Sequence, residues 1–276
     1  MFLTKKSILK ILVITICYFL LGSICGIAYR CLQIIGISVP FLNVLSLIVY
    51  GMCVLIILVG GYGEGKGNLI NLGNKLVLKE LRPADFINHY ISLKNANDLM
   101  VASPSAEVLQ LVVLAYNALE DRENALATID EMIAVAKNKK KPFAKLLKAS
   151  LLYDYGETEE AEALFFEAKE QKLDMLGKYL ADAILKSDRA MALGDYMVAE
   201  TFFLETLAHT HPKRDKLARL ATNKSLGDLY LELQDNEKAI MHYQYCVVNG
   251  GETAIRKNAA KKLEELKRQQ TAAIEE

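Results

Sequence analysis

Between residues 125 and 243, four alanines that are each followed four residues later by a large apolar residue are spaced at regular intervals of 36, 38 and 40 residues. Positions i and i+4 lie on the same face of a helix, so each pair places a small residue beside a large one. The small residue lets a second helix approach closely, and the large one fills the neighbouring groove. The four pairs are Ala125 with Ile129, Ala161 with Phe165, Ala199 with Phe203, and Ala239 with Tyr243.

Two further features accompany each of these alanines. A polar or glycine-bearing turn precedes it, as in Gln234-Asp235-Asn236, whose side chains can cap the following helix. Three of the four residues that stand twelve positions before the alanines are small. The sequence therefore predicts four pairs of antiparallel helices, clearest at residues 223–250 and least regular in the third pair. The positions twelve before are Val113, Ala149, Ser187 and Gly227.

The fourth pair resembles the tetratricopeptide repeat (TPR) pattern, with Leu226-Gly227 followed by Tyr230, and Ala239 followed by Tyr243. The resemblance extends over residues 103–253 and implies an all-α fold. In that fold about four repeats form an α-solenoid with helical caps and a concave protein-binding face. An ordinary helical bundle with alanine-rich packing is the alternative, and the regular period favours the solenoid.

The first part of the sequence is much more apolar than the rest and raises the mean hydropathy to +0.17. Two runs, residues 8–29 and 41–60, are each long enough to cross a bilayer as a helix. Lys and Arg cluster at the start of the first run and after the second, and Arg30 is the only basic residue between the two runs. We therefore expect a transmembrane hairpin in an integral protein of the plasma membrane, with both termini and the repeats in the cytoplasm. A signal peptide cleaved near Ala28 is the alternative, which the length of the apolar region disfavours.

The sequence predicts four segments along the chain. The second of them begins with Gly60–Gly67, which matches a phosphate-binding loop up to its lysine but lacks the final Ser or Thr, so we expect a flexible hinge there. Ser103-Pro104 is expected to start the repeats, as a helix cap followed by proline. The segments are a transmembrane hairpin at 1–62, a Gly-rich hinge and N-terminal helical cap at 63–102, the TPR-like repeats at 103–253, and a C-terminal capping helix and tail at 254–276.

Charge and residue types exclude several classes of function. Residues 83–276 carry 25 Lys and Arg against 31 Asp and Glu, which disfavours binding to nucleic acid. Only Cys246 of the five cysteines lies in the repeats, so a disulfide framework is not possible there. The four histidines lack zinc-ligand spacing, and the catalytic motifs G-x-S-x-G and H-E-x-x-H do not occur. We expect no metal, no cofactor and no enzymatic activity.

The inner face of the first helices is expected to form a mostly apolar binding groove, with Phe143, Tyr153 and Met191 as anchors. We expect no clamp for a C-terminal carboxylate, because the positions that TPR clamps fill with Lys and Asn hold other residues here. The alternative is that these side chains pack within the solenoid. The predicted groove residues are Gln110, Leu114, Asn117, Phe143, Leu146, Tyr153, Ile184, Asp188, Met191, Lys224, Asp228 and Leu231.

The function predicted from these features is that of a membrane-anchored cytoplasmic scaffold or adaptor. It would bind a protein or peptide in the groove and contact the lipid bilayer through two spans. The alternative is a structural subunit of a membrane protein assembly, in which the transmembrane helices make the main contacts.

Overall fold

The computed structural model describes residues 65–96, 98, 104–137 and 140–275, with scattered single residues between 16 and 52. Within these residues the chain consists of helices joined by turns, without a strand, so the predicted all-α class is confirmed. The chain divides into two compact units, residues 1–71 with 96–103, and residues 72–95 with 104–276. The second unit contains the helix pairs and the candidate site.

The predicted membrane spans, residues 8–29 and 41–60, lie outside the described residues except for scattered positions. In the part of the chain that the structure describes, no helix combines the length and the apolar character needed to cross a bilayer. The prediction of an integral plasma-membrane protein with cytoplasmic repeats is therefore wrong on this finding. It was based on the hydropathy and length of the two runs and on the flanking charges, whereas a span requires a continuous apolar helix of about 20 residues.

The first continuous described helix begins inside the predicted hinge. Residues 65–73 are helical, and they include Gly65 and Gly67 of the predicted hinge. The π-helix η1 covers Asn74–Lys79, and α3 covers Pro83–Asn95. α3 starts with proline, which suits the first turn of a helix because its missing N–H would have no partner there.

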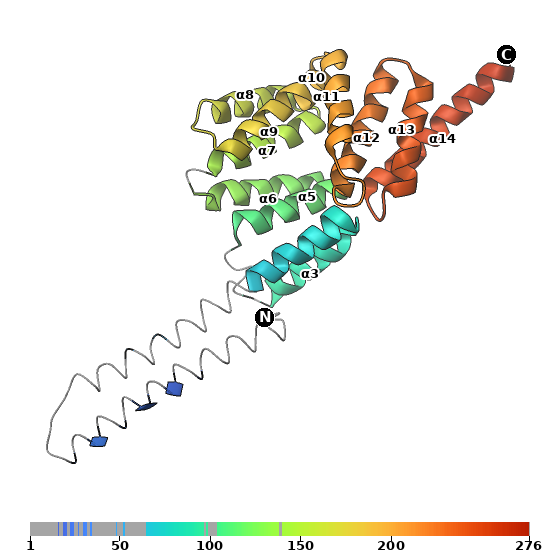
Figure 1. Ribbon diagram of the computed structural model, residues 1–276. Helices are drawn as coiled ribbons and strands as arrows, with labels where there is room; N and C mark the ends of the chain where they lie inside the picture. Colours follow the sequence, from blue (N-terminus) through green and yellow to red (C-terminus); the bar gives the residue numbers. More distant parts are fainter. Residues whose placement is uncertain are drawn as a thin grey trace. The chain divides into compact units, whose positions relative to one another are not determined.

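Four helix pairs follow, each made of helices joined by a short turn (Figure 1). The first pair begins later than predicted, because Ser105 rather than Ser103 caps it by accepting a hydrogen bond from Val108 N. The pairs are α5 (Ala106–Ala118) with α6 (Arg122–Val135), α7 (Lys141–Asp154) with α8 (Thr158–Lys169), α9 (Met175–Lys186) and α10 (Asp188–Ala192) with α11 (Tyr196–His209), and α12 (Lys216–Glu232) with α13 (Asn236–Asn249); α14 (Ala254–Glu275) packs against α13.

The repeated alanines and their large partners lie in the interfaces of these pairs, and all eight side chains are buried. In the fourth pair, a Cβ added to Gly227 of α12 would lie 2.7 Å from Cε1 of Tyr243 on α13. Any larger residue at 227 would therefore require the Tyr243 ring or the helices themselves to shift. The small-against-large packing predicted from the sequence is therefore present at this crossing.

The four pairs share one turn geometry. The residue five positions before each repeated alanine has a positive φ: Glu120 (55°), Gly156 (78°), Gly194 (76°) and Gln234 (59°). The next amide donates to the carbonyl five residues earlier, as in Asp235 N to Tyr230 O at 2.8 Å, and the same bond occurs in the other three turns. This is a Schellman motif, which satisfies carbonyls at the end of the first helix. Its recurrence at one position shows that the pairs are built on a common plan.

The third pair departs from this plan in its first helix, which is broken into α9 and α10. Ser187 lies between them with φ −109° and ψ −84°, and its hydroxyl donates to Ala183 O at 2.8 Å. A serine hydroxyl bonded to the backbone competes with regular helical geometry. The break lies in the pair that the sequence pattern predicted to be least regular.

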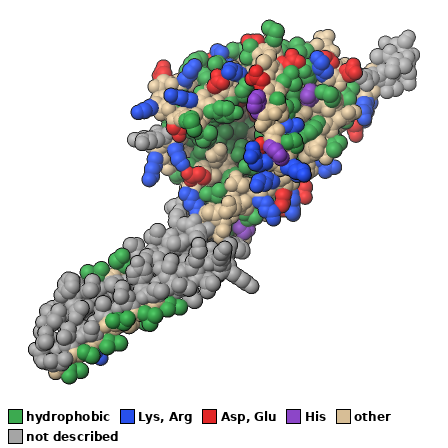
Figure 2. Space-filling view, viewed as in Figure 1, with side chains coloured by type: hydrophobic (Ala, Val, Ile, Leu, Met, Phe, Trp, Pro, Cys, Tyr) green, Lys and Arg blue, Asp and Glu red, His purple; other side chains and the backbone are tan. Residues whose placement is uncertain are grey.

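The two ends of the second unit meet. The Glu252 amide, between α13 and α14, donates to Leu81 O at 2.9 Å, and a Cβ on Gly251 would lie 2.7 Å from Leu81 Cβ. The side-chain amide of Asn258 on α14 also donates to the Glu120 carboxylate, which follows α5. Segments at the start and end of this unit are thus in contact, and Figure 2 shows that one face of the unit is hollowed.

Candidate functional site: a cavity among the first helices

A cavity of about 430 Å³ lies where α5, α7 and α12, which are first helices of three pairs, approach α14. Three of the predicted groove residues line it: Asn117, Lys224 and Asp228. The structure therefore brings together residues from the first and fourth pairs that are more than 100 positions apart in the sequence. The other polar residues that line the cavity are Glu120, Arg122, Asp154, Tyr155, Ser225, Tyr243, Asn258 and Lys262.

Asp228 on α12 is surrounded by donors. One carboxylate oxygen accepts hydrogen bonds from Lys262 Nζ at 2.5 Å and from Tyr243 OH at 2.6 Å, and the other lies 3.2 Å from Lys224 Nζ. Burial on its own raises the pKa of this carboxyl, but Lys224 and the two hydrogen bonds outweigh it, so its pKa lies below the usual value. Asp228 is therefore ionised, and it holds both lysines in place.

The charged groups at the rim of the cavity are also paired. Arg122 forms an ion pair with Glu157, and its guanidinium lies 5.0 Å from the centre of the Tyr155 ring. The hydroxyl of Tyr155 donates to Asn117 Oδ1 at 3.1 Å. Burial, with the charge of Asp154 adding to it, raises the pKa of Tyr155 to about 12. Tyr155 is therefore a neutral donor at physiological pH.

Asp154, the last residue of α7, differs from these groups. Its carboxylate makes no hydrogen bond and no ion pair with any residue that the structure describes. Burial among the protein atoms around the cavity raises its pKa, Lys224 opposes this effect, and the negative charge of Asp228 adds to it. The side chain of Asp154 is also exposed to solvent where it lines the cavity.

Asp188 on α10 lies near Asp154 but outside the lining of the cavity. Its carboxylate accepts hydrogen bonds from Ser150 Oγ at 2.5 Å and from Ser187 Oγ at 2.7 Å. Burial, followed by the charge of Asp154, raises the pKa of Asp188 to about 7. Two carboxyls of like charge therefore interact unfavourably on this side of the cavity.

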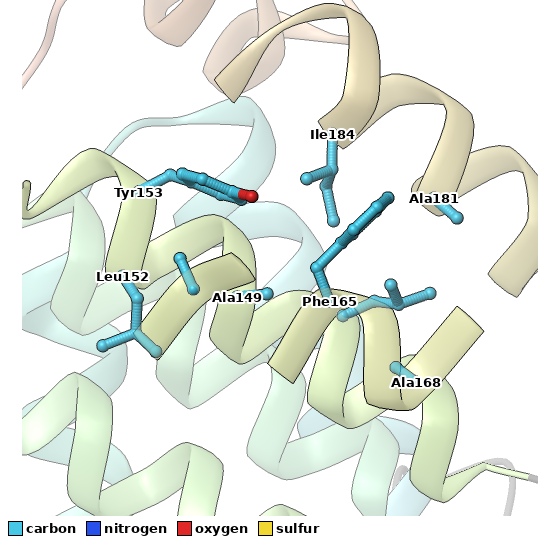
Figure 3. Close-up of a cluster of buried hydrophobic side chains, with 9 residues drawn as sticks. Ala149, Leu152, Tyr153, Phe165, Ala168, Ala181 and Ile184 are labelled. Carbon is cyan, nitrogen blue, oxygen red and sulfur yellow. The ribbon is translucent and has the colours of Figure 1, made fainter. Parts of the chain in front are cut away.

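Three predicted groove residues belong instead to the hydrophobic core. Leu146, Tyr153 and Ile184 are 0%, 6% and 1% exposed and form one cluster with Phe165, in which the Tyr153 and Ile184 side chains lie near each other (Figure 3). The hydroxyl of Tyr153 donates to Glu162 Oε1 of α8 at 2.7 Å. The prediction that these residues form an open groove is wrong, because they lie on the faces of α7 and α9 that pack against α8. For these three, the alternative of packing within the helix pairs is correct.

The remaining predicted residues have mixed positions. Phe143 is half-buried against a second cluster that contains Ile129 and Met132. Four others are half-buried and do not line the cavity: Gln110, Leu114, Met191 and Leu231. Of the polar members of the predicted set, Asn117, Lys224 and Asp228 line the cavity, whereas Gln110 and Asp188 do not, and none of its apolar members lines it.

Sequence reasoning missed Asp154, Asn258 and Lys262. Asp154 carried one signal, since an acidic residue in the last turn of a helix faces the negative end of the helix dipole and costs about 0.3–1 kcal/mol. Asn258 and Lys262 carried none, because α14 was assigned only as a cap. Across the described residues, no group of three or more His, Cys, Asp or Glu side chains is placed to hold a metal ion.

Comparison with protein-family models, with curated proteins and with solved structures gives no match for this chain. The function is therefore argued from the geometry of the cavity and the helix pairs.

Proposed function

We propose that the four helix pairs are TPR-like repeats of an α-solenoid and that the cavity binds a peptide segment of a protein partner. The repeat assignment is supported by the Schellman turn at one position in every pair and by the period of 36–40 residues. Stacked helix pairs create a concave surface from their first helices, and repeat proteins of this kind use that surface for binding.

The observation that carries the proposal is the convergence of polar and aromatic side chains from three pairs on one cavity. Asn117, Asp154 and Lys224 come from α5, α7 and α12, and Tyr243 adds an aromatic ring from α13. A volume of about 430 Å³ accommodates one or two large side chains. The site proposed here is more polar than the apolar groove expected from the sequence, because Tyr153 and Ile184 are in the core.

The proposal is tested by selecting peptides from a random dodecapeptide display library on the full-length chain. Ala221, which is exposed and lines the cavity, is replaced by tryptophan to fill it. The matched control is Ala134→Trp, at an exposed position of α6 outside the cavity. We expect Ala221→Trp to weaken the binding of selected peptides by about tenfold or more, since filling the pocket removes its contacts. Equal binding by both variants would contradict the proposal.

A further inference from the structure

All but one of the charged side chains that line the cavity have a hydrogen-bond or ion-pair partner among the described residues. Asp228 is shared by Lys224, Lys262 and the Tyr243 hydroxyl. Arg122 is paired with Glu157, and Glu120 accepts from Asn258. Every cation of the lining is therefore in an ion pair that the structure itself supplies. Asp154 is the one charged lining residue without a hydrogen bond or ion pair to any described residue.

Two neighbours make the surroundings of Asp154 more negative. It ends α7, so the partial negative charge of the helix C-terminus lies beside its carboxylate. Asp188 interacts with it unfavourably from α10. Lys224 attracts Asp154 from a distance but is in contact with Asp228. An acidic residue that breaks the local preference of its helix and has no internal partner is the kind of exception that is expected at a binding site.

Building on the proposed function, we infer that Asp154 receives the positively charged side chain of a lysine or arginine in the bound peptide. The ammonium or guanidinium group would donate to the Asp154 carboxylate and would also lie at the negative end of the α7 dipole. An acidic group at the same place would face Asp154 and Asp188 and would have to displace Asp228 from a lysine. The geometry therefore favours basic over acidic peptides.

The experiment is a double-mutant cycle with a peptide selected on the full-length chain and sensitive to Ala221→Trp. Each arginine of the peptide is replaced in turn by citrulline and each lysine by acetyl-lysine, both of which remove the charge and keep most of the shape. On the parent chain, one such replacement should weaken binding about tenfold, the size of one charge-assisted hydrogen bond. On the Asp154→Asn variant, the same replacement should change binding by less than about twofold. The control Glu265→Gln removes an exposed carboxylate of α14 outside the cavity and should retain the tenfold loss.

The outcomes separate this inference from the proposed function. Two results would overturn the inference and leave the proposed function standing. One is that selected peptides whose binding is weakened by Ala221→Trp contain no Lys or Arg. The other is that removing the peptide's charge weakens binding by the same factor on the parent chain and on Asp154→Asn. Peptides that are insensitive to Ala221→Trp would contradict the proposed function and the inference with it. Asp154→Asn should fold normally, because it removes an unfavourable charge from a helix C-terminus, and circular dichroism checks this.

Discussion

The absence of a side chain at position 227 sets how closely α12 and α13 approach. The Tyr243 ring occupies the place that a Cβ would need, at 2.7 Å, and the ring is held there by its hydrogen bond to Asp228. The same tyrosine thus packs against Gly227 of α12 on one side and contributes its hydroxyl to the cavity on the other. At this residue, the packing of the α12–α13 pair and the shape of the proposed site depend on each other.

Gly227→Leu should destabilise the protein by about 1–3 kcal/mol, because the added side chain overpacks a close helix crossing. Thermal unfolding of the full-length chain measures the effect. Ala218→Leu is the control, since it adds leucine at an exposed position of the same helix. Equal melting temperatures for the two variants would mean that α12 and α13 do not cross at Gly227.

Asp188 should make stability depend on pH. Its folded-state pKa of about 7 lies above the ordinary value of 3.8, so the folded chain binds this proton more tightly than the unfolded chain does. Stability that is present at low pH is therefore lost as the pH rises from about 4 to about 7. The groups that face it are Ser150, Ser187 and Asp154.

Asp188→Asn should accordingly stabilise the protein at pH 8 by about 1–3 kcal/mol and have little effect at pH 4. Urea unfolding at the two pH values measures this difference. Asp182→Asn, at an exposed position of α9, serves as the control and should show no comparable gain. A loss of stability at pH 8 for Asp188→Asn would show that the carboxylate is favourable where it lies.

At the scale of the helix pairs, the common element is the turn between the two helices. Two of the four turns place glycine at the positive-φ position, and the other two place Glu120 and Gln234 there. A residue with a Cβ is strained in this conformation by roughly 1 kcal/mol relative to glycine. The first and fourth pairs therefore contain a small unfavourable term that the second and third avoid.

Gln234→Gly should stabilise the protein by about 0.5–1 kcal/mol, because it relieves the strain at φ 59°. The same replacement at Gln244, an exposed position within α13, should instead destabilise it by about 1 kcal/mol. Chemical denaturation measures both variants. Effects of the same sign at the two positions would contradict the assigned turn.

Some features of the helix pairs can be predicted from the sequence and others cannot. The repeated alanines and the turns before them were predictable, because both depend on residues within one helix pair. The residues of the inner face were not predictable, since a shift of one position along the helix, which is a rotation of about 100° around its axis, decides whether Tyr153 points into a groove or into the core. The break at Ser187 was predicted only as irregularity, because a serine in a helix bonds its own backbone in some contexts and not in others.

At the scale of the second unit, the contact between its ends forms the cavity. Glu120 and Asn258 meet although 138 positions separate them. This contact depends on how each helix pair packs against the next, which is not encoded in any short segment. The sequence therefore predicted helix pairs and three of the cavity residues, but not the cavity.

Gly251→Val should open this contact, since Gly251 has φ 56° and its Cβ would meet Leu81. The amide of Glu252, which donates to Leu81 O, should then exchange with solvent at least about tenfold faster. Gly156→Val is the control, because it strains a positive-φ position with no neighbour within 4 Å. Faster exchange of the Glu252 amide in both variants would indicate general destabilisation instead of a local contact.

The location of the bound peptide is the most direct test of the proposed site. A photo-reactive amino acid is placed at Ser225, which lines the cavity, or at Ala134, which lies outside it, and the full-length chain is irradiated with a selected peptide. We expect the peptide to cross-link from position 225 and not from position 134, with excess unlabelled peptide abolishing the product. Cross-linking from 134 but not from 225 would contradict the central claim that the cavity among α5, α7, α12 and α14 is the binding site.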